Sequence, residues 1–139
     1  MEKFIVYTVI LIILAGFLFW GFQTGFFVQL FTGPVKPVAV PEGTLLFYGA
    51  DCPHCKIVED YIVKNNIDKI VKYTKLEVPF NSKTSAELEA NAVLAIQLAK
   101  SCKLSTINGV GIPFLYDGKN CILGQDDVIN FFKNAANIK

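Results

Sequence analysis

The chain has 139 residues, of which 53% are hydrophobic, and its formal net charge at pH 7 is +1. All of its basic residues other than one histidine are lysines, so the sequence offers neither a bidentate arginine clamp for phosphate nor a basic stripe. This composition excludes the usual kinds of nucleic-acid-binding protein.

The beginning of the chain is strongly apolar. The stretch Phe4–Phe22 contains no charged residue, and about 20 apolar residues are enough to cross a bilayer as a helix. We therefore predict an N-terminal transmembrane anchor in residues 1–31 that lies in the lipid bilayer. A cleavable signal peptide is the alternative, but the apolar stretch is long for one and no small-residue cleavage site follows it.

The rest of the chain divides into a linker and one domain. Residues 32–43 include three prolines and predict a stiff spacer. Residues 44–139 are enough for one small hydrophobic core. Four cysteines in so small a chain favour an oxidising compartment. We predict a single-pass membrane protein whose soluble domain is extracytoplasmic, either periplasmic or extracellular.

The first half of this domain predicts a strand, a helix and a second strand. Thr44–Tyr48 is a continuous apolar run, which is typical of a strand buried on both faces. A helix is predicted from Cys52 to about Asn66, with Ile57 among its inward-facing residues. The alternating segment Ile70–Val78 predicts a second strand, parallel to the first.

The second half predicts a helix, a hairpin and a last helix. Thr84 and Glu87 have the spacing of a capping box, which opens a helix that runs to about Cys102. Phe114–Tyr116 and Cys121–Leu123 flank an Asp-Gly pair and predict a hairpin. A final helix follows Gly124. The order is β-α-β-α-β-β-α, an α/β fold.

The motif Cys52-Pro53-His54-Cys55 lies where the first strand turns into the first helix of the domain. Proline is tolerated at the first position of a helix, which makes Cys52 the predicted N-cap. The sulfur of Cys52 would then face unpaired N–H groups and the positive end of the helix dipole, which favour the nucleophilic thiolate. Half of a zinc site is the alternative for this motif.

The order of elements, with Cys-x-x-Cys after the first strand and a proline before the third, resembles the thioredoxin-like fold in its short, glutaredoxin-like form. The resemblance covers roughly 44–136 and implies a four-stranded mixed sheet. It also implies that Pro113 follows a cis peptide bond and that the backbone of Ile112 pairs with a substrate peptide. A trans proline in an ordinary turn is the alternative.

The Pro-His dipeptide resembles that of the DsbA-type disulfide oxidants of the bacterial periplasm. A protonated His54 would stabilise the reduced state and so make the disulfide oxidising; an exposed histidine without effect is the alternative. The resemblance implies a thiol–disulfide oxidoreductase, with oxidation favoured over reduction. Its implied catalytic residues are Cys52, Cys55, His54, Pro53 and Pro113.

This activity would use protein thiols and disulfides as substrates and a membrane redox partner, of the quinone-linked kind, to carry the electrons. It would need no cofactor and no metal. Two alternatives from another class are a module with zinc on all four cysteines and a redox-inert tether. A four-cysteine zinc site normally has two close-spaced pairs, whereas only one pair is close here.

The sequence departs from the family pattern at two positions and leaves one cysteine pair open. Asp51 stands where such proteins often have tryptophan, and Leu46 stands where they often bury an acid. Glu59, one helical turn after Cys55, is a candidate substitute for that acid. Cys102 and Cys121 form a structural disulfide, two separate buried thiols, or a second redox pair that passes oxidation to or from the first.

Overall fold

The computed structural model describes residues 2–23, 38–81 and 84–138. The chain forms two compact units, Met1–Lys36 and Pro37–Lys139. The boundary between the units falls within the predicted linker. Residues 24–37, which include the end of the predicted anchor and the first half of that linker, lie outside the described residues.

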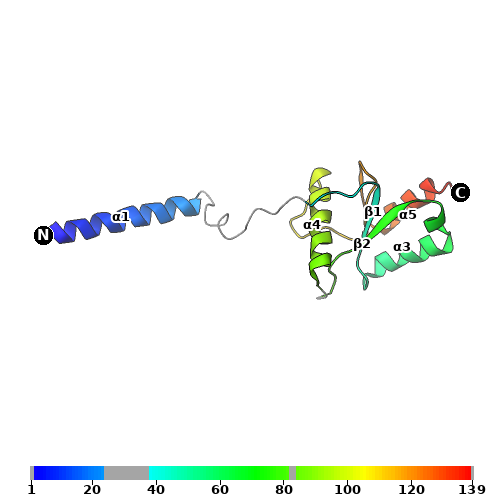
Figure 1. Ribbon diagram of the computed structural model, residues 1–139, viewed down its shortest axis with the longest axis horizontal. Coiled ribbons are helices and arrows are strands. Elements are labelled where there is room, and N and C mark those ends of the chain that lie inside the picture. Colours follow the sequence, from blue (N-terminus) through cyan, green and yellow to red (C-terminus); the bar gives the residue numbers. More distant parts are fainter. Residues whose placement is uncertain (1, 24–37, 82–83, 139) are drawn as a thin grey trace. The chain divides into compact units, whose positions relative to one another are not determined.

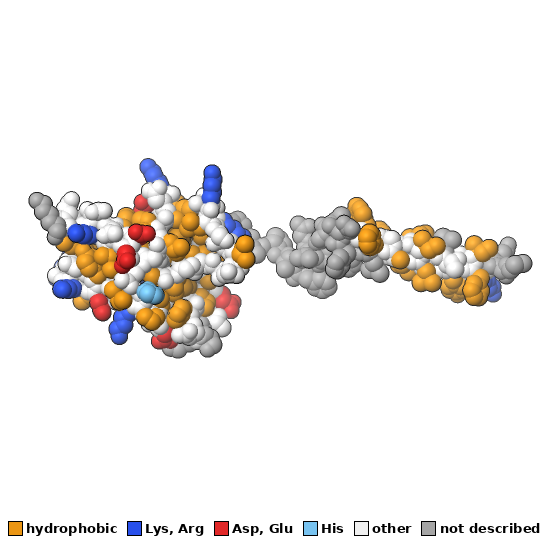
Figure 2. Space-filling model, turned by 180° about the vertical axis from the view of Figure 1, so that it is seen from behind, with side chains coloured by type: hydrophobic (Ala, Val, Ile, Leu, Met, Phe, Trp, Pro, Cys, Tyr) orange, Lys and Arg blue, Asp and Glu red, His pale blue; other side chains and the backbone are white. Residues whose placement is uncertain are grey.

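The first unit contains the helix α1, Glu2–Gln23. Its surface is mostly hydrophobic (Figure 2), and side chains such as Phe4 and Phe17 are exposed. A search of the described residues identifies no helix that meets the length and apolarity needed to cross a membrane.

The second unit is built on a four-stranded mixed sheet with the order β2-β1-β3-β4. Its strands are β1 (Thr44–Tyr48), β2 (Tyr73–Glu77), β3 (Phe114–Tyr116) and β4 (Cys121–Leu123). β1 pairs with β2 in parallel and with β3 antiparallel, and β3 pairs with β4 antiparallel. This is the α/β class and the mixed sheet that the sequence predicted.

Helices cover both faces of this sheet (Figure 1). One face carries α4 alone, and the other carries α3 and α5. The helices of the unit are α3 (Pro53–Lys64), the short 3-10 helix η1 (Ile67–Lys69), α4 (Ala86–Ser101) and α5 (Gln125–Ala135).

Alternate residues of β1 point to opposite faces, which explains its unbroken apolar sequence. Leu45 and Phe47 lie in the core beneath α4, whereas Leu46 lies in the core beneath α3 and α5. On β3, Phe114 and Leu115 divide in the same way. Because both faces are covered, a polar residue at any of these positions would be buried without a partner. The motif Cys52-Pro53-His54-Cys55 therefore follows a strand whose central residues are fully buried.

Three details of the sequence prediction are wrong. The second strand begins at Tyr73 instead of Ile70, because η1 and a turn occupy the preceding residues. The N-cap of α4 is Ser85 and not Thr84: the Ser85 hydroxyl accepts the N–H of Leu88 over 3.3 Å. Ile57 is 47% exposed and so faces away from the core.

Candidate active site

The turn between β1 and α3 places Cys52 at the N-cap of α3. The N–H of Cys52 donates to the carbonyl oxygen of Gly49 over 3.1 Å, and the Cys52 backbone is extended. Pro53 is the first helical residue, where its missing N–H leaves no bond unmade. The Cys52 Sγ accepts the N–H of Cys55 over 3.4 Å. The sulfur therefore takes the place of a capping oxygen at the positive end of the helix dipole, where negative charge is stabilised.

Gly49 allows the turn before Cys52 to pass close to other segments. A Cβ on this residue would lie 2.8 Å from the Cβ of Phe80 and 2.9 Å from the Cδ1 of Ile112. Any side chain here would push these two neighbours away. The sequence analysis missed Gly49, although a glycine directly between a buried strand and a Cys-x-x-Cys motif was a usable signal.

The segment before β3 lies against the Cys52 sulfur. The carbonyl oxygen of Ile112 is 3.9 Å from Cys52 Sγ, and the Ile112–Pro113 peptide bond is cis, as the resemblance implied. The carbonyl oxygen of Pro113 accepts the N–H of Gly124 over 2.9 Å, which ties this segment to the start of α5. The fold thus brings Cys52 together with residues 60 positions away in the sequence.

The two cysteines of the motif are free thiols in unequal surroundings. Cys52 is 3% exposed and Cys55 is 1% exposed. Burial, a hydrogen bond with Cys52 and the nearby charge of Glu59 together raise the pKa of Cys55 well above its ordinary value. Cys55 therefore holds its proton at neutral pH. The site has one sulfur at a helix N-terminus and a second, deeper sulfur that stays protonated.

His54 is exposed and links α3 to α5. Its ring Nδ1 lies 3.0 Å from the Oε1 of Gln125, so the protonated Nδ1 donates a hydrogen bond across the two helices. The sequence analysis assigned His54 a role in stabilising the reduced state and did not identify Gln125. A polar residue opening a helix carries no local signal for a partner 71 positions away.

A surface pocket of about 580 Å³ opens beside the motif. Its lining comes from the start of α3, the segment before β3 and the start of α5. The lining residues are His54, Ile112, Pro113, Leu123, Gly124, Gln125, Asp126 and Asp127. Apolar and acidic side chains therefore line one concave surface beside the Cys52-Pro53-His54-Cys55 motif.

The second cysteine pair forms a disulfide. Cys102 ends α4 and Cys121 begins β4, and their Cα atoms are 6.0 Å apart. Because these two sulfurs are bonded to each other, they cannot join Cys52 and Cys55 on one zinc ion. Among the described residues, no group of three or more histidine, cysteine or acidic side chains is arranged to hold a metal.

Comparisons with known proteins add little to this geometry. No protein-family model and no curated protein matches the chain. A search of solved structures finds the crystal structure of oxidized glutaredoxin 2 from Chlamydomonas reinhardtii, with 16% sequence identity and a TM-score of 0.42. The match covers 68% of this chain and 74% of the other. A match this distant supports no argument. The fold is established by the strand order and strand pairing of this chain.

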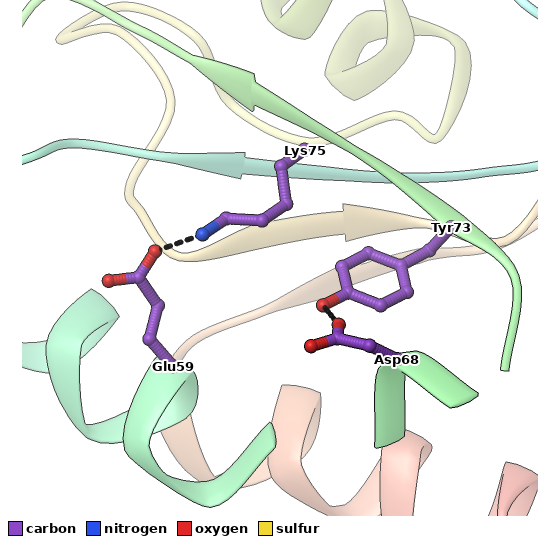
Figure 3. Close-up of polar contacts among 4 residues, drawn as sticks. All are labelled: Glu59, Asp68, Tyr73 and Lys75. Atoms are coloured by element: carbon purple, nitrogen blue, oxygen red, sulfur yellow. Dashed lines mark hydrogen bonds and ion pairs between the residues drawn. The ribbon is translucent and has the colours of Figure 1, made fainter. Parts of the chain in front are cut away.

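Leu46, which stands where the resemblance leads us to expect a buried acid, lies in the core. Leu46 is 1% exposed and packs in the core beneath α3 and α5, so this position offers no proton acceptor. Glu59 lies at the margin of the same region and forms an ion pair with Lys75 of β2 (Figure 3). Asp51 is exposed.

Proposed function

We propose that this chain is a thiol–disulfide oxidoreductase that exchanges disulfides with protein substrates through Cys52 and Cys55. The observation that carries the proposal is the position of the Cys52 sulfur. It caps α3, accepts the N–H of Cys55 and lies 3.9 Å from the carbonyl oxygen of Ile112. A thiolate is stabilised at such a helix end and is the species that attacks disulfides.

The two cysteines would act in sequence. In the reducing direction, the Cys52 thiolate attacks a substrate disulfide, forms a mixed disulfide and releases one substrate thiolate. Cys55 then loses its proton and attacks Cys52, which forms the Cys52–Cys55 disulfide and releases the second substrate thiolate. In the oxidising direction the same bonds form and break in reverse order.

The pocket beside the motif supports a protein substrate over a small enclosed ligand. It is open to solvent, and Ile112 and Pro113 are among its lining residues. A peptide lying along Ile112 and Pro113 would present its cysteine to Cys52. His54 and Asp126, which also line the pocket, would contact the flanking residues.

The direction of electron flow and the location of the protein also belong to this proposal. The Pro53-His54 dipeptide favours an oxidant, which would return its electrons to a membrane redox partner of the quinone-linked kind. The N-terminal stretch Phe4–Phe22 supports a membrane tether with the redox domain outside the cytoplasm. This part of the proposal depends on the sequence alone, since none of the described helices meets the length and apolarity needed for a span.

The full chain, equilibrated in glutathione buffers and alkylated, tests the proposal by mass spectrometry. We expect Cys52 and Cys55 to be oxidised or reduced together, while Cys102 and Cys121 remain bonded. A potential near about −120 mV supports an oxidant, whereas one near about −270 mV, that of thioredoxin, contradicts the oxidising direction. If Cys52 and Cys55 never exchange with glutathione, the chain is a redox-inert module. Resistance of the chain to alkaline extraction from membranes tests the tether separately.

A further inference from the structure

The proposed function leaves the proton of Cys55 without an acceptor. Cys55 is 1% exposed and has a raised pKa, so it must lose its proton to a nearby group before it can attack Cys52. No charged side chain among the described residues is fully buried. The acceptor must therefore lie at the edge of the core, within reach of the first turns of α3.

Glu59 lies at this edge. It is four residues after Cys55 on α3, so the two side chains lie on the same side of the helix. Its side chain is 34% exposed, and its charge is close enough to contribute to the raised pKa of Cys55. By contrast Asp60, the next residue, is exposed and makes no such contribution.

Lys75 holds Glu59 in this position. The Nζ of Lys75 donates to Glu59 Oε1 (Figure 3) and lies 4.5 Å from the centre of the Tyr48 ring. Lys75 of β2 is paired with Leu46 of β1 across the two parallel strands. Lys75 is therefore next to the position where the resemblance led us to expect a buried acid. The ion pair therefore joins α3 to β2 one helical turn after Cys55.

Among the charged groups of the described residues, Cys52 and Glu59 raise the pKa of Cys55. Glu59 is paired with Lys75, and its charge also contributes to the raised pKa of Tyr73. The Tyr73 hydroxyl donates a hydrogen bond to Asp68 Oδ1 (Figure 3), and burial together with this bond raises the pKa of Tyr73. Tyr73 therefore stays neutral and protonated over the pH range in which a carboxylate could serve Cys55.

We propose that Glu59 accepts the proton of Cys55 and that Lys75 is the residue that positions it. This inference rests on the proposed function. In the resolving step the S–H bond of Cys55 breaks and its proton passes to the Glu59 carboxylate, directly or through one water. The Cys55 electron pair forms the bond to Cys52 Sγ as the Cys52–substrate bond breaks, and the substrate leaves as a thiolate. In the opposite direction Glu59 returns the proton to Cys55.

Ellman's reagent separates the two steps in the reduced full chain. Attack by Cys52 releases the first thionitrobenzoate, and attack by Cys55 on the resulting mixed disulfide releases the second. The leaving group needs no proton, so the second phase reports the deprotonation and attack of Cys55. We expect Glu59→Gln to slow the second phase by roughly a hundredfold or more at pH 7 and to leave the first phase unchanged.

The sign of the effect distinguishes proton transfer from a simple charge effect. If Glu59 acted only through its charge, Glu59→Gln would lower the pKa of Cys55 and make the second phase faster. A second phase that is unchanged or faster overturns the proposal. The variant is also expected to show a second phase that rises with pH over the range in which the wild-type rate is flat. Glu59→Asp should recover part of the rate, and failure of this rescue also counts against proton transfer.

Two further variants complete the test. Asp60→Asn removes a carboxylate from the same helix and serves as the matched control, with both phases expected to equal those of the wild type. Equal slowing in Asp60→Asn and Glu59→Gln would overturn the proposal. Lys75→Gln is expected to slow the second phase by a few-fold, since Glu59 loses its partner. If the wild type itself shows no second phase, the proposed function fails, and not merely this inference.

Discussion

The two cysteine pairs of this chain have the same chemistry and different surroundings. Cys52 and Cys55 are free thiols at the first turn of α3, beside a pocket and a backbone carbonyl. Cys102 and Cys121 are bonded and join the end of α4 to the start of β4. The first pair lies at a helix N-terminus, where charge on sulfur is stabilised, whereas the second closes a loop of the chain. Under the proposed function, these different surroundings predict that the first pair reacts and that the second supports the fold.

Removal of Cys52 should have the largest effect on activity. In Cys52→Ala the sulfur at the helix N-terminus is lost, and Cys55 is buried and protonated at neutral pH. We expect the rate of mixed-disulfide formation to fall by roughly a thousandfold or more, measured with Ellman's reagent at pH 7. Cys55→Ala is the matched control and should retain the first reaction and accumulate the mixed disulfide. A Cys52→Ala protein that reacts at the wild-type rate would assign the nucleophile to another thiol.

Removal of the other pair should act on stability instead. The bridge between Cys102 and Cys121 spans 19 positions, and closing a loop of this length stabilises a fold by about 3 kcal/mol. We expect the double variant Cys102→Ala/Cys121→Ala to lose about this free energy of unfolding in guanidinium titrations. Its first reaction with Ellman's reagent should stay within a few-fold of the wild type. Loss of that reaction in a folded double variant would mean that the two pairs are not separate in role.

Much of this division could be predicted from the sequence, because it depends on local patterns. β1 was predicted to the residue, since the four consecutive apolar residues after Thr44 have to be covered on both faces. β3 and β4 were predicted as well because Asp117 turns the chain between them: its Oδ1 accepts the N–H groups of Lys119 and Asn120. Burial and the hydrogen bonds of this turn act within a few residues, so they leave a readable pattern.

The contacts that complete the site could not be predicted in the same way. The approach of Ile112 to Cys52 was expected only from the resemblance, and the hydrogen bond between His54 and Gln125 was not expected at all; each joins segments at least 60 residues apart. Such contacts depend on how the sheet is assembled and on the absence of a side chain at Gly49. The N-cap of α4 was missed for a related reason. Thr84 and Ser85 can both cap a helix, and Thr84 instead donates to Glu89 over 2.8 Å.

Gly49 offers a way to disturb the reactive pair without touching sulfur. In Gly49→Ala the new Cβ would lie within 3 Å of Phe80 and Ile112, so both neighbours must move. We expect a loss of about 1–3 kcal/mol in the free energy of unfolding. We also expect a several-fold slower reaction of Cys52, because Ile112 moves away from its sulfur. Gly118→Ala, in the turn after β3, is the control: it has open space around its Cβ and should affect stability without slowing Cys52.

The smallest effect is expected from the titration of Cys55 at alkaline pH. The pKa of Cys55 is raised in the folded protein by burial, so the folded state retains a proton that the unfolded state releases above about 9.0. The stabilisation is therefore fully present below that pH and is lost as pH rises toward the folded-state pKa. We expect the reduced chain to lose at most about 1.4 kcal/mol per pH unit in this window. Tyr73, whose pKa is also raised by burial, adds a similar loss only above its ordinary value of 10.0.

The comparison with Cys55→Ser isolates this contribution. A serine hydroxyl does not titrate in this range, so the difference in unfolding free energy between wild type and variant should shrink from pH 9 to pH 10. The measurement is made anaerobically without reductant, so that the bridge between Cys102 and Cys121 stays closed. A difference that is constant over this window would mean that Cys55 ionises equally in the folded and unfolded chains. In that case burial does not raise the pKa of Cys55, and the two sulfurs of the motif do not differ in the way that their surroundings predict.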